Sequence, residues 1–253
     1  MESRNQPTYS NIFLPKITFT ETPLLTLRKT AWKTALREME WFLTGDSMCP
    51  EELRPWWQHQ LNPDGNYFGG YGEQFRYSKG DFIHNFDQIQ FIQDALKSNP
   101  NSRRLILTSW NPYDMAHITE LNDNPNCPTT CHCSMVQFFV RNGKLHINSY
   151  QRSADMLLGV PHNWCQSWAM LMWFAHNANL EVGTMQWAFG DAHCYSDPSH
   201  IEAAQAIIAC DLSKRVFDSP RLAYNGNGDF KASDFEIIGK IPEPVTKIKP
   251  ILF

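Results

Sequence analysis

Four stretches of the chain have the apolar pattern of helices, with apolar residues three or four positions apart or on nearly every side. They are residues 30–43, 86–96, 164–180 and 200–210. Gly45 and Gly183 follow the first and third stretches as stop signals. The third stretch is apolar nearly all the way round, which predicts a helix buried in the middle of a domain.

Shorter β-rich runs separate these helices. Residues 136–140 and 144–150 flank Asn142-Gly143, and Asn-Gly between two such runs is a strong hairpin signal. Residues 104–110 and 185–189 are predicted as further strands. Helices and strands alternate with no regular βαβ period, no internal repeat and no linker, so we expect one α+β domain over residues 1–253.

Composition narrows the class of protein. Hydrophobic residues make up 42% of the 253 residues and aromatic residues 13%, which indicates a folded protein with a sizeable core. The net charge is −4 and no long basic run occurs, so nucleic acid is not an expected partner. Neither a membrane span nor a signal peptide is visible, and seven cysteines are an odd number. We therefore expect a cytoplasmic protein with reduced thiols and no membrane partner.

The densest group of reactive side chains consists of Cys127, Cys131, His132 and Cys133. A zinc site is one interpretation, but Cys131 and Cys133 are too close for the usual knuckle and no second knuckle follows. A nucleophilic thiolate is the other, and it needs cations nearby to lower the thiol pKa. A purely structural role for a loop cysteine also stays open.

Arginines next to hydroxyls suit a phosphate monoester. Such groups occur at Ser102-Arg103-Arg104 and at Gln151-Arg152-Ser153. The chain has neither a P-loop nor a dinucleotide-binding fingerprint, so a metal-free arginine cluster is the remaining way to hold a phosphate. An ordinary surface ion pair explains either group alone equally well.

Seven segments in sequence order resemble the thymidylate synthase family along nearly the whole chain. They are residues 37–46, 71–76, 100–111, 131–132, 151–155, 158–163 and 190–195. Residues 234–239 and 248–253 are similar to the C-terminal segment with which the family closes over its ligands. The resemblance implies a homodimer of α+β subunits, with a mixed β-sheet at the interface flanked by helices. Each subunit binds deoxyuridylate or a related deoxynucleotide and a reduced folate.

The resemblance also implies a mechanism in which a cysteine thiolate adds to C6 of the pyrimidine. C5 then becomes nucleophilic and attacks 5,10-methylenetetrahydrofolate, the co-substrate. Cys131 stands in the place of the nucleophile. The run from Cys131 to Gln137 is one residue longer than in the family, so it needs a bulge, and Cys133 stays open as the nucleophile.

Further roles are carried over by position from the family. Arg152 is expected to lower the thiol pKa and to hold the phosphate, together with Ser153. The other residues expected at the phosphate are Arg103 and Arg104, which act across the dimer interface, and Arg4 from the N-terminal loop. Those expected at the sugar 3′-hydroxyl are His193 and Tyr195.

On the folate side of the site, Asp155 is expected to face the co-substrate and Trp57 and Tyr71 to line the pocket or the route of protons, with Phe253 in the closing tail. Glu38 matches the carboxylate that moves protons through bound water. Asn163 matches the residue that reads the base: its carboxamide donates to O4 and accepts from N3–H, as uracil requires. Deoxyuridylate is therefore the predicted substrate.

The predicted product depends on what captures the methylene carried by C5. Synthases use hydride from the folate, whereas viral hydroxymethylases of the same superfamily admit water. Three single-residue departures from the synthases, Glu40, Gln60 and His162, favour water, as does the longer run at residues 196–200. The leading prediction is a deoxyuridylate hydroxymethyltransferase, in the host cytoplasm if it is viral. Thymidylate synthase is the alternative, and an inactive or zinc-bearing binding protein is an alternative of another class.

Overall fold

The structure is a computed structural model that describes residues 8–9, 14–79, 85–215 and 217–248. Two predicted site residues, Arg4 and Phe253, lie outside the described residues. The helices are α1 (Trp32–Thr44), α2 (Arg54–Trp57), α3 (Tyr71–Tyr77), α4 (Gln88–Ser98), α5 (Pro112–Ala116), α6 (Ile118–Leu121), α7 (Gly159–Asn177) and α8 (Pro198–Ile208), with 3-10 helices η1 (Glu51–Leu53), η2 (Leu212–Lys214) and η3 (Ala232–Asp234). The strands are β1 (Thr8–Tyr9), β2 (Ile17–Phe19), β3 (Ser78–Lys79), β4 (Asn85–Phe86), β5 (Ile106–Leu107), β6 (Met135–Arg141), β7 (Lys144–Asp155), β8 (Glu181–Tyr195), β9 (Arg221–Tyr224) and β10 (Phe235–Ile238).

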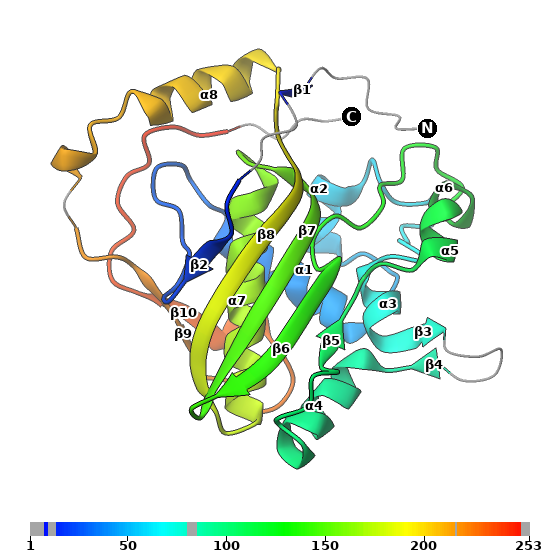
Figure 1. The fold of residues 1–253 in the computed structure, drawn as a ribbon. Helices are drawn as coiled ribbons and strands as arrows, with labels where there is room; N and C mark the ends of the chain where they lie inside the picture. The colour runs from blue at the N-terminus through cyan, green and yellow to red at the C-terminus, as the bar shows by residue number, and fades with distance from the viewer. Residues whose placement is uncertain (1–7, 10–13, 80–84, 216, 249–253) are drawn as a thin grey trace.

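A six-stranded mixed sheet organises the fold (Figure 1). Its strand order is β1-β8-β7-β6-β5, and β2 also pairs with β8. Strands β7 and β8 run parallel, with α7 between them in the sequence, whereas the other neighbours in this sheet are antiparallel. The predicted α+β class with a mixed sheet is confirmed.

The hairpin predicted from Asn142-Gly143 is present. Strands β6 and β7 pair from Met135↔Tyr150 to Arg141↔Lys144. Asn142 and Gly143 both have positive φ, 52° and 74°, as a type I′ turn requires. The turn therefore sets the register that brings the far ends of both strands to the candidate site.

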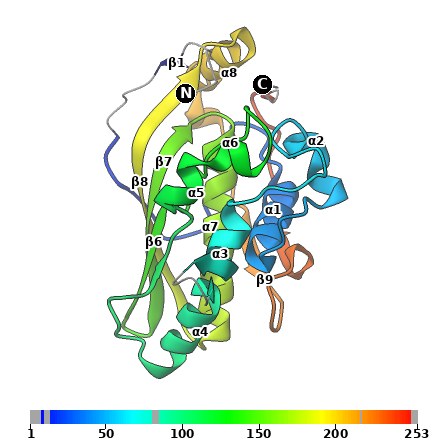
Figure 2. The ribbon, with the colours of Figure 1, turned by 90° about the vertical axis from the view of Figure 1, so that its right-hand side faces the viewer.

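In the described part of the chain, helices cover one face of this sheet only. Figure 2 shows the sheet nearly edge-on, with α7 against it and α3 and α1 farther out. The core lies between these layers: Phe138 of β6 packs against Phe174 of α7 with ring centroids 4.8 Å apart, and Leu36 of α1 is fully buried. Each such side chain contributes roughly 1.5–3 kcal/mol through its burial.

The opposite face of the sheet carries no helix in the part of the chain that the structure describes (Figures 1 and 2). Large side chains lie exposed there. Met135 is 45% exposed and its cross-strand partner Tyr150 is 40% exposed. On the next strand, Ile106 is 38% exposed. An apolar sheet face of this kind is typical of a surface that packs against another protein.

Several predicted elements differ in extent, among them α7, β8 and β5. Helix α7 starts at Gly159 rather than at 164, because Pro161 is tolerated in a first turn and the Asp155 carboxylate accepts the N–H groups of Leu157 and Leu158. Strand β8 runs over Glu181–Tyr195 because it pairs with β7 along most of its length. Strand β5 is only Ile106–Leu107, since the next N–H group bonds the Gln88 side chain instead of a strand.

Among the described residues, no helix has the length and apolar character that a bilayer crossing needs. Helix α7 is apolar on nearly every side, and most of its residues are buried between the sheet and the outer helices. The apolar character of α7 therefore reflects its place inside the protein.

Candidate active site

The structure brings Cys131 and Tyr71 into direct contact. The backbone N–H of Cys131 donates to the Tyr71 hydroxyl at 2.9 Å, and the Cys131 Sγ lies 3.4 Å from the same oxygen. Because that oxygen accepts from the backbone, its own proton is free to point at the sulfur. Burial raises the pKa of the Cys131 thiol, while the Tyr71 hydrogen bond and the Arg152 charge lower it. Burial has the larger effect, so the pKa of the Cys131 thiol is raised overall, and Tyr71 and Arg152 are the groups that favour its thiolate.

Cys133 has a different environment. It is fully buried, whereas Cys131 is partly exposed, and burial raises the pKa of the Cys133 thiol to about 12. Cys133 also has a φ of 50°, in the left-handed region. These features are those of a structural thiol inside the protein.

The predicted bulge lies at this point. Met135 pairs with Tyr150, and two positions further the Arg152 N–H donates to the carbonyl of Cys131 at 3.0 Å, not to residue 133. The segment before β6 therefore has two more residues than the strand opposite. The bulge turns Cys133 into the core and leaves Cys131 beside Tyr71.

Arg152 lies on β7 next to the bulge and is partly exposed. Its guanidinium donates to the Thr129 hydroxyl at 2.8 Å and to the Thr130 carbonyl at 3.3 Å, and lies 5.4 Å from the centre of the Trp110 ring. The neighbouring Ser153 is also partly exposed. A charged fork held in this way, beside a hydroxyl, is suited to an anion such as a phosphate.

The structure does not bring Arg103 and Arg104 to Arg152. Both arginines are exposed and precede β5. The Arg103 carbonyl accepts from the Gln137 side chain at 3.2 Å, which places this segment along the middle of β6 rather than at the bulge. Within one subunit, these two arginines therefore do not join the Cys131 cluster.

A chain of hydrogen bonds links Glu38 to Asn163. Trp57 Nε1 donates to Glu38 Oε1 at 2.5 Å, and Gln166 Nε2 donates to Glu38 Oε2 at 2.6 Å. Asn163 donates to Gln166 Oε1 at 3.2 Å and accepts from Gln151 Nε2 at 3.0 Å. Burial raises the pKa of Glu38, and the bonds from Trp57 and Gln166 oppose that shift. The predicted proton-moving carboxylate and the predicted base-reading carboxamide thus belong to one network.

Trp57 is buried, and its indole N–H donates to Glu38, a contact that the sequence analysis did not predict. Its expected place on the folate side of the pocket stays a prediction. Gln151 and Gln166 are network members that the sequence analysis missed. The signal was available for Gln166, because a glutamine inside a helix that is apolar nearly all round needs buried partners.

Asp155, His193 and Tyr195 lie at the ends of β7 and β8. Asp155 pairs with His193 across the two parallel strands, and the His193 ring packs edge-on against Tyr195 at 5.2 Å. His193 Nδ1 lies 3.5 Å from the Asp191 carboxylate. The Asp155 carboxylate accepts from the backbone at the start of α7. Asp155 therefore has a structural function in addition to the predicted contact with folate.

Two of the three single-residue departures that favoured water are tied to the backbone. Glu40 accepts from the Ala232 N–H at 2.8 Å, so it fastens α1 to η3. His162 Nδ1 lies 2.8 Å from the Leu158 carbonyl and Nε2 accepts from the Ala31 N–H at 3.2 Å. Backbone hydrogen bonds thus give both side chains a structural function, whichever species captures the methylene. For Gln60, the backbone N–H donates to the Trp57 carbonyl at 2.7 Å, and the residue is partly exposed.

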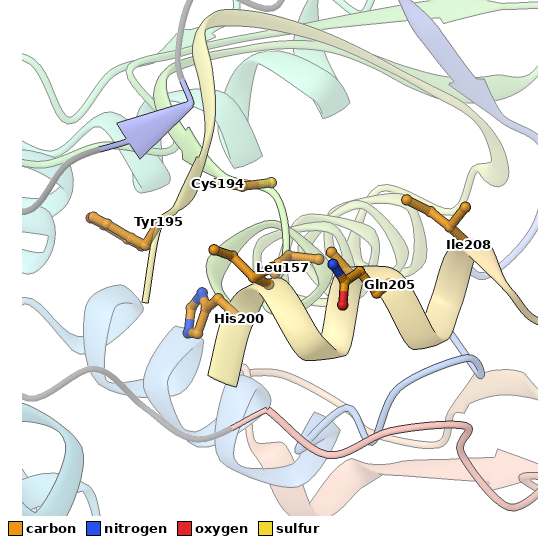
Figure 3. Close-up of a pocket in the computed structure, with 8 residues that line it drawn as sticks. Leu157, Cys194, Tyr195, His200, Gln205 and Ile208 are labelled. Carbon is orange, nitrogen blue, oxygen red and sulfur yellow. The ribbon is translucent and has the colours of Figure 1, made fainter. Parts of the chain in front are cut away.

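A cavity of about 200 Å³ lies elsewhere, between the end of β8 and α8. Figure 3 shows Tyr195 and His200 at one end of it and Ile208 at the other, with Cys194 and Leu157 between them. Its lining is almost entirely apolar and does not include Cys131. The cavity therefore does not reach the nucleophile, although it shares Tyr195 with the ends of β7 and β8.

The described residues contain no group of three or more His, Cys, Asp or Glu side chains placed to hold a metal ion. This includes the cluster that suggested zinc in the sequence. Its cysteines are free thiols, and His132 is buried with a pKa lowered to about 3 by burial.

Comparison with known proteins agrees with the resemblance seen in the sequence. A family model described as thymidylate synthase matches residues 5–251. A thymidylate synthase of Corynebacterium aurimucosum is 37% identical over 231 residues, which make up 89% of this chain and 81% of that protein. The chain therefore belongs to the thymidylate synthase family.

Proposed function

We propose that the protein transfers a one-carbon unit from 5,10-methylenetetrahydrofolate to C5 of deoxyuridylate, with Cys131 as the nucleophile. The observation that carries this proposal is the Tyr71–Cys131 pair, in which a partly exposed sulfur lies 3.4 Å from a hydroxyl that is able to donate to it. Nucleophilic catalysis by cysteine needs such stabilisation of the thiolate.

In this mechanism the Cys131 thiolate adds to C6 of the base, and the electron pair of the C5–C6 double bond moves to C5 and O4. C5 then attacks the methylene carbon carried by the folate. The C5 proton is lost, the bond between this carbon and the folate nitrogen breaks, and a methylene remains on C5. Glu38 moves protons between the base and solvent. Arg152 and Ser153 hold the phosphate, and Asn163 holds the base.

In this proposal, residues at the ends of β7 and β8 bind the sugar and the folate. His193 and Tyr195 hold the 3′-hydroxyl of deoxyuridylate, and Asp155 and Trp57 lie on the folate side. Two features support these roles: Asp155 pairs with His193 in the sheet, and Trp57 shares Glu38 with the rest of the site.

For the product, we propose thymidylate. Glu40 and His162 suggested water capture, but both are engaged by backbone groups. The similarity to a thymidylate synthase of Corynebacterium aurimucosum points the same way. Hydride from tetrahydrofolate then adds to the methylene on C5, the C6–S bond to Cys131 breaks, and thymidylate and dihydrofolate leave.

Hydroxymethylation is the second candidate, and Gln60 is the observation that favours it. A partly exposed amide stands close to Trp57 in the chain, where synthases carry a second Trp. A polar amide holds water more readily than an indole does. In this case tetrahydrofolate leaves, water adds to the methylene, the C6–S bond to Cys131 breaks, and 5-hydroxymethyldeoxyuridylate is released.

Product analysis by mass spectrometry, with dihydrofolate absorbance followed in parallel, decides between them. We expect thymidylate and dihydrofolate in equal amounts. A 5-hydroxymethyl product without dihydrofolate would instead support the second candidate. Replacing Gln60 by Trp then tests whether the amide admits the water.

The nucleophile is tested by covalent trapping of 5-fluorodeoxyuridylate with the folate. Cys131→Ala should abolish the trapped complex, because no other partly exposed thiol lies beside Tyr71. Cys133→Ala is the matched control and should still form it, since that thiol is buried. A complex that survives only in Cys131→Ala would make Cys133 the nucleophile.

A further inference from the structure

We infer that Gln166 is a positioning residue that ties Glu38 directly to Asn163 and so holds the Asn163 carboxamide in the orientation that reads uracil. This inference rests on the proposed function. Gln166 is fully buried on α7, one turn after Asn163, and it reaches both groups with one side chain.

The orientation of Gln166 is decided by a neighbour that is only an acceptor. Its Nε2 donates to the Ala35 carbonyl at 3.1 Å as well as to Glu38 Oε2 at 2.6 Å. A carbonyl oxygen cannot donate, so the amide nitrogen must face Ala35 and the amide oxygen must face Asn163. Asn163 therefore has to present its nitrogen to Gln166.

The other end of the network is decided in the same way. Trp187 Nε1, which is only a donor, lies 3.2 Å from Gln151 Oε1, and Gln151 Nε2 donates to the Ser153 carbonyl at 2.9 Å. The Gln151 nitrogen therefore faces Asn163 and requires the oxygen of that carboxamide. Gln166 and Gln151 therefore require the same orientation of the Asn163 carboxamide.

In this orientation Asn163 keeps one N–H and one oxygen lone pair that the network does not use. These are the donor that O4 of uracil accepts and the acceptor that N3–H needs, whereas cytosine presents the reverse pattern. Turning the carboxamide over sets donor against donor at Gln151 and acceptor against acceptor at Gln166. Without Gln166 only one of these penalties remains.

Gln166 also affects Glu38. Its N–H favours the ionised carboxylate, and the Trp57 indole does the same. The thiols whose ionisation the Glu38 charge opposes are Cys49, near Arg54, and Cys131, near Arg152. Loss of the Gln166 donor therefore moves the ionisation of Glu38 to higher pH.

Two variants separate these effects. Gln166→Leu keeps approximate volume but removes both bonds, so the preference for deoxyuridylate over deoxycytidylate, as the ratio of kcat/KM values, should fall about tenfold. Gln166→Glu keeps an acceptor for Asn163 but sets a second carboxyl against Glu38, and the two buried carboxyls share one proton. This variant should retain the preference, while the acid limb of the pH–rate profile moves to higher pH.

Three controls complete the experiment. Cys165→Ala, beside Gln166 and fully buried, should keep both the preference and the pH profile. Alkylation of Cys131 over the same pH series reports the ionisation of the thiol, which distinguishes it from the ionisation of Glu38. Thermal unfolding shows whether each variant is folded. If Gln166→Leu does not fold, the inference is tested with Gln166→Glu, by its pH profile and by its binding of both nucleotides.

A Gln166→Leu enzyme that loses kcat equally for both nucleotides, with an unmoved pH profile, would overturn the inference, because a structural residue behaves in that way. So would an unmoved profile in Gln166→Glu. Failure of the proposed function looks different: the unaltered protein itself would then neither turn over nor trap the deoxyuridylate compounds.

Discussion

The Tyr71 hydroxyl faces two groups of one residue, the backbone N–H and the sulfur of Cys131. The N–H is only a donor, so the phenol acts as acceptor toward the backbone and as donor toward the sulfur. At the scale of a residue, this is the feature that distinguishes Cys131 from the other cysteines of the described chain.

Replacing Tyr71 by Phe should raise the pKa of the Cys131 thiol, because the Tyr71 hydrogen bond lowers it. Less thiolate is then present at a given pH, and alkylation by iodoacetamide near neutral pH should slow roughly tenfold, as for a lost hydrogen bond to a charged group. The midpoint of the pH series should move upward. Tyr113→Phe, at an exposed position, is the control; an unmoved midpoint in Tyr71→Phe would remove Tyr71 from thiolate stabilisation.

Replacing Asn163 by Asp should shift the preference from deoxyuridylate toward deoxycytidylate. An ionised carboxyl cannot donate to O4, and it also meets the oxygen of Gln166 with another oxygen. The kcat/KM values for both nucleotides provide the measurement, and the protein should also lose about 1–3 kcal/mol of stability from the unmatched pair. An unchanged ratio would mean that Asn163 does not select the base.

Between elements, His162 joins α7 to the residue that caps α1. Its Nδ1 faces a carbonyl and so donates, which leaves Nε2 as the acceptor for the Ala31 N–H. The ring is therefore neutral in this arrangement. Burial, helped by the charge of Arg28, lowers the pKa of His162 to about 4.

The depressed pKa predicts a loss of stability in acid. In the unfolded chain His162 is protonated below about pH 6.5, whereas in the folded protein it is protonated only near and below its pKa of about 4. The free energy of unfolding should thus be highest above pH 6.5 and fall by several kcal/mol toward pH 4, with His132 adding to the slope.

Urea unfolding at pH 7, 5.5 and 4 measures this dependence. His162→Phe should flatten it, and at pH 7 the variant should lose about 1 kcal/mol with its hydrogen bonds. His59→Asn, at an exposed position, should leave the dependence as it is. An equally steep fall in His162→Phe would mean that this histidine does not titrate with folding.

At the scale of the whole molecule, we propose a homodimer formed through the uncovered face of the sheet. Met135, Tyr150 and Ile106 expose apolar surface there. Arg103 and Arg104 are separate from Arg152 within one subunit. In the dimer, each subunit would supply these two arginines to the phosphate site of the other.

Subunit complementation tests this proposal. Cys131→Ala and the double variant Arg103→Ala with Arg104→Ala should each be nearly inactive. After the two are mixed and re-associated, half of the dimers are mixed and one site in each is intact, so about a quarter of normal activity should return. No recovery, although mixed dimers are seen by native mass spectrometry, would place these arginines outside the partner's site.

Much of this protein can be read from the sequence because the deciding signals are local or ordered along the chain. The helix spacing of residues 30–43 and the Asn-Gly hairpin depend on near neighbours, and both are confirmed. Seven ordered segments were enough to identify the family, which the comparisons confirm. The roles of the individual site residues stay predictions that await the experiments above.

What required the tertiary structure are the partners of polar groups that lie far apart in the sequence. Glu40 meets Ala232 and His162 meets Ala31, contacts between residues more than 100 positions apart. Gln166 bonds Glu38, and no local pattern specifies which buried acceptor a glutamine will find. A buried polar group must be paired, but only the packing of α1, α7 and the sheet decides with what.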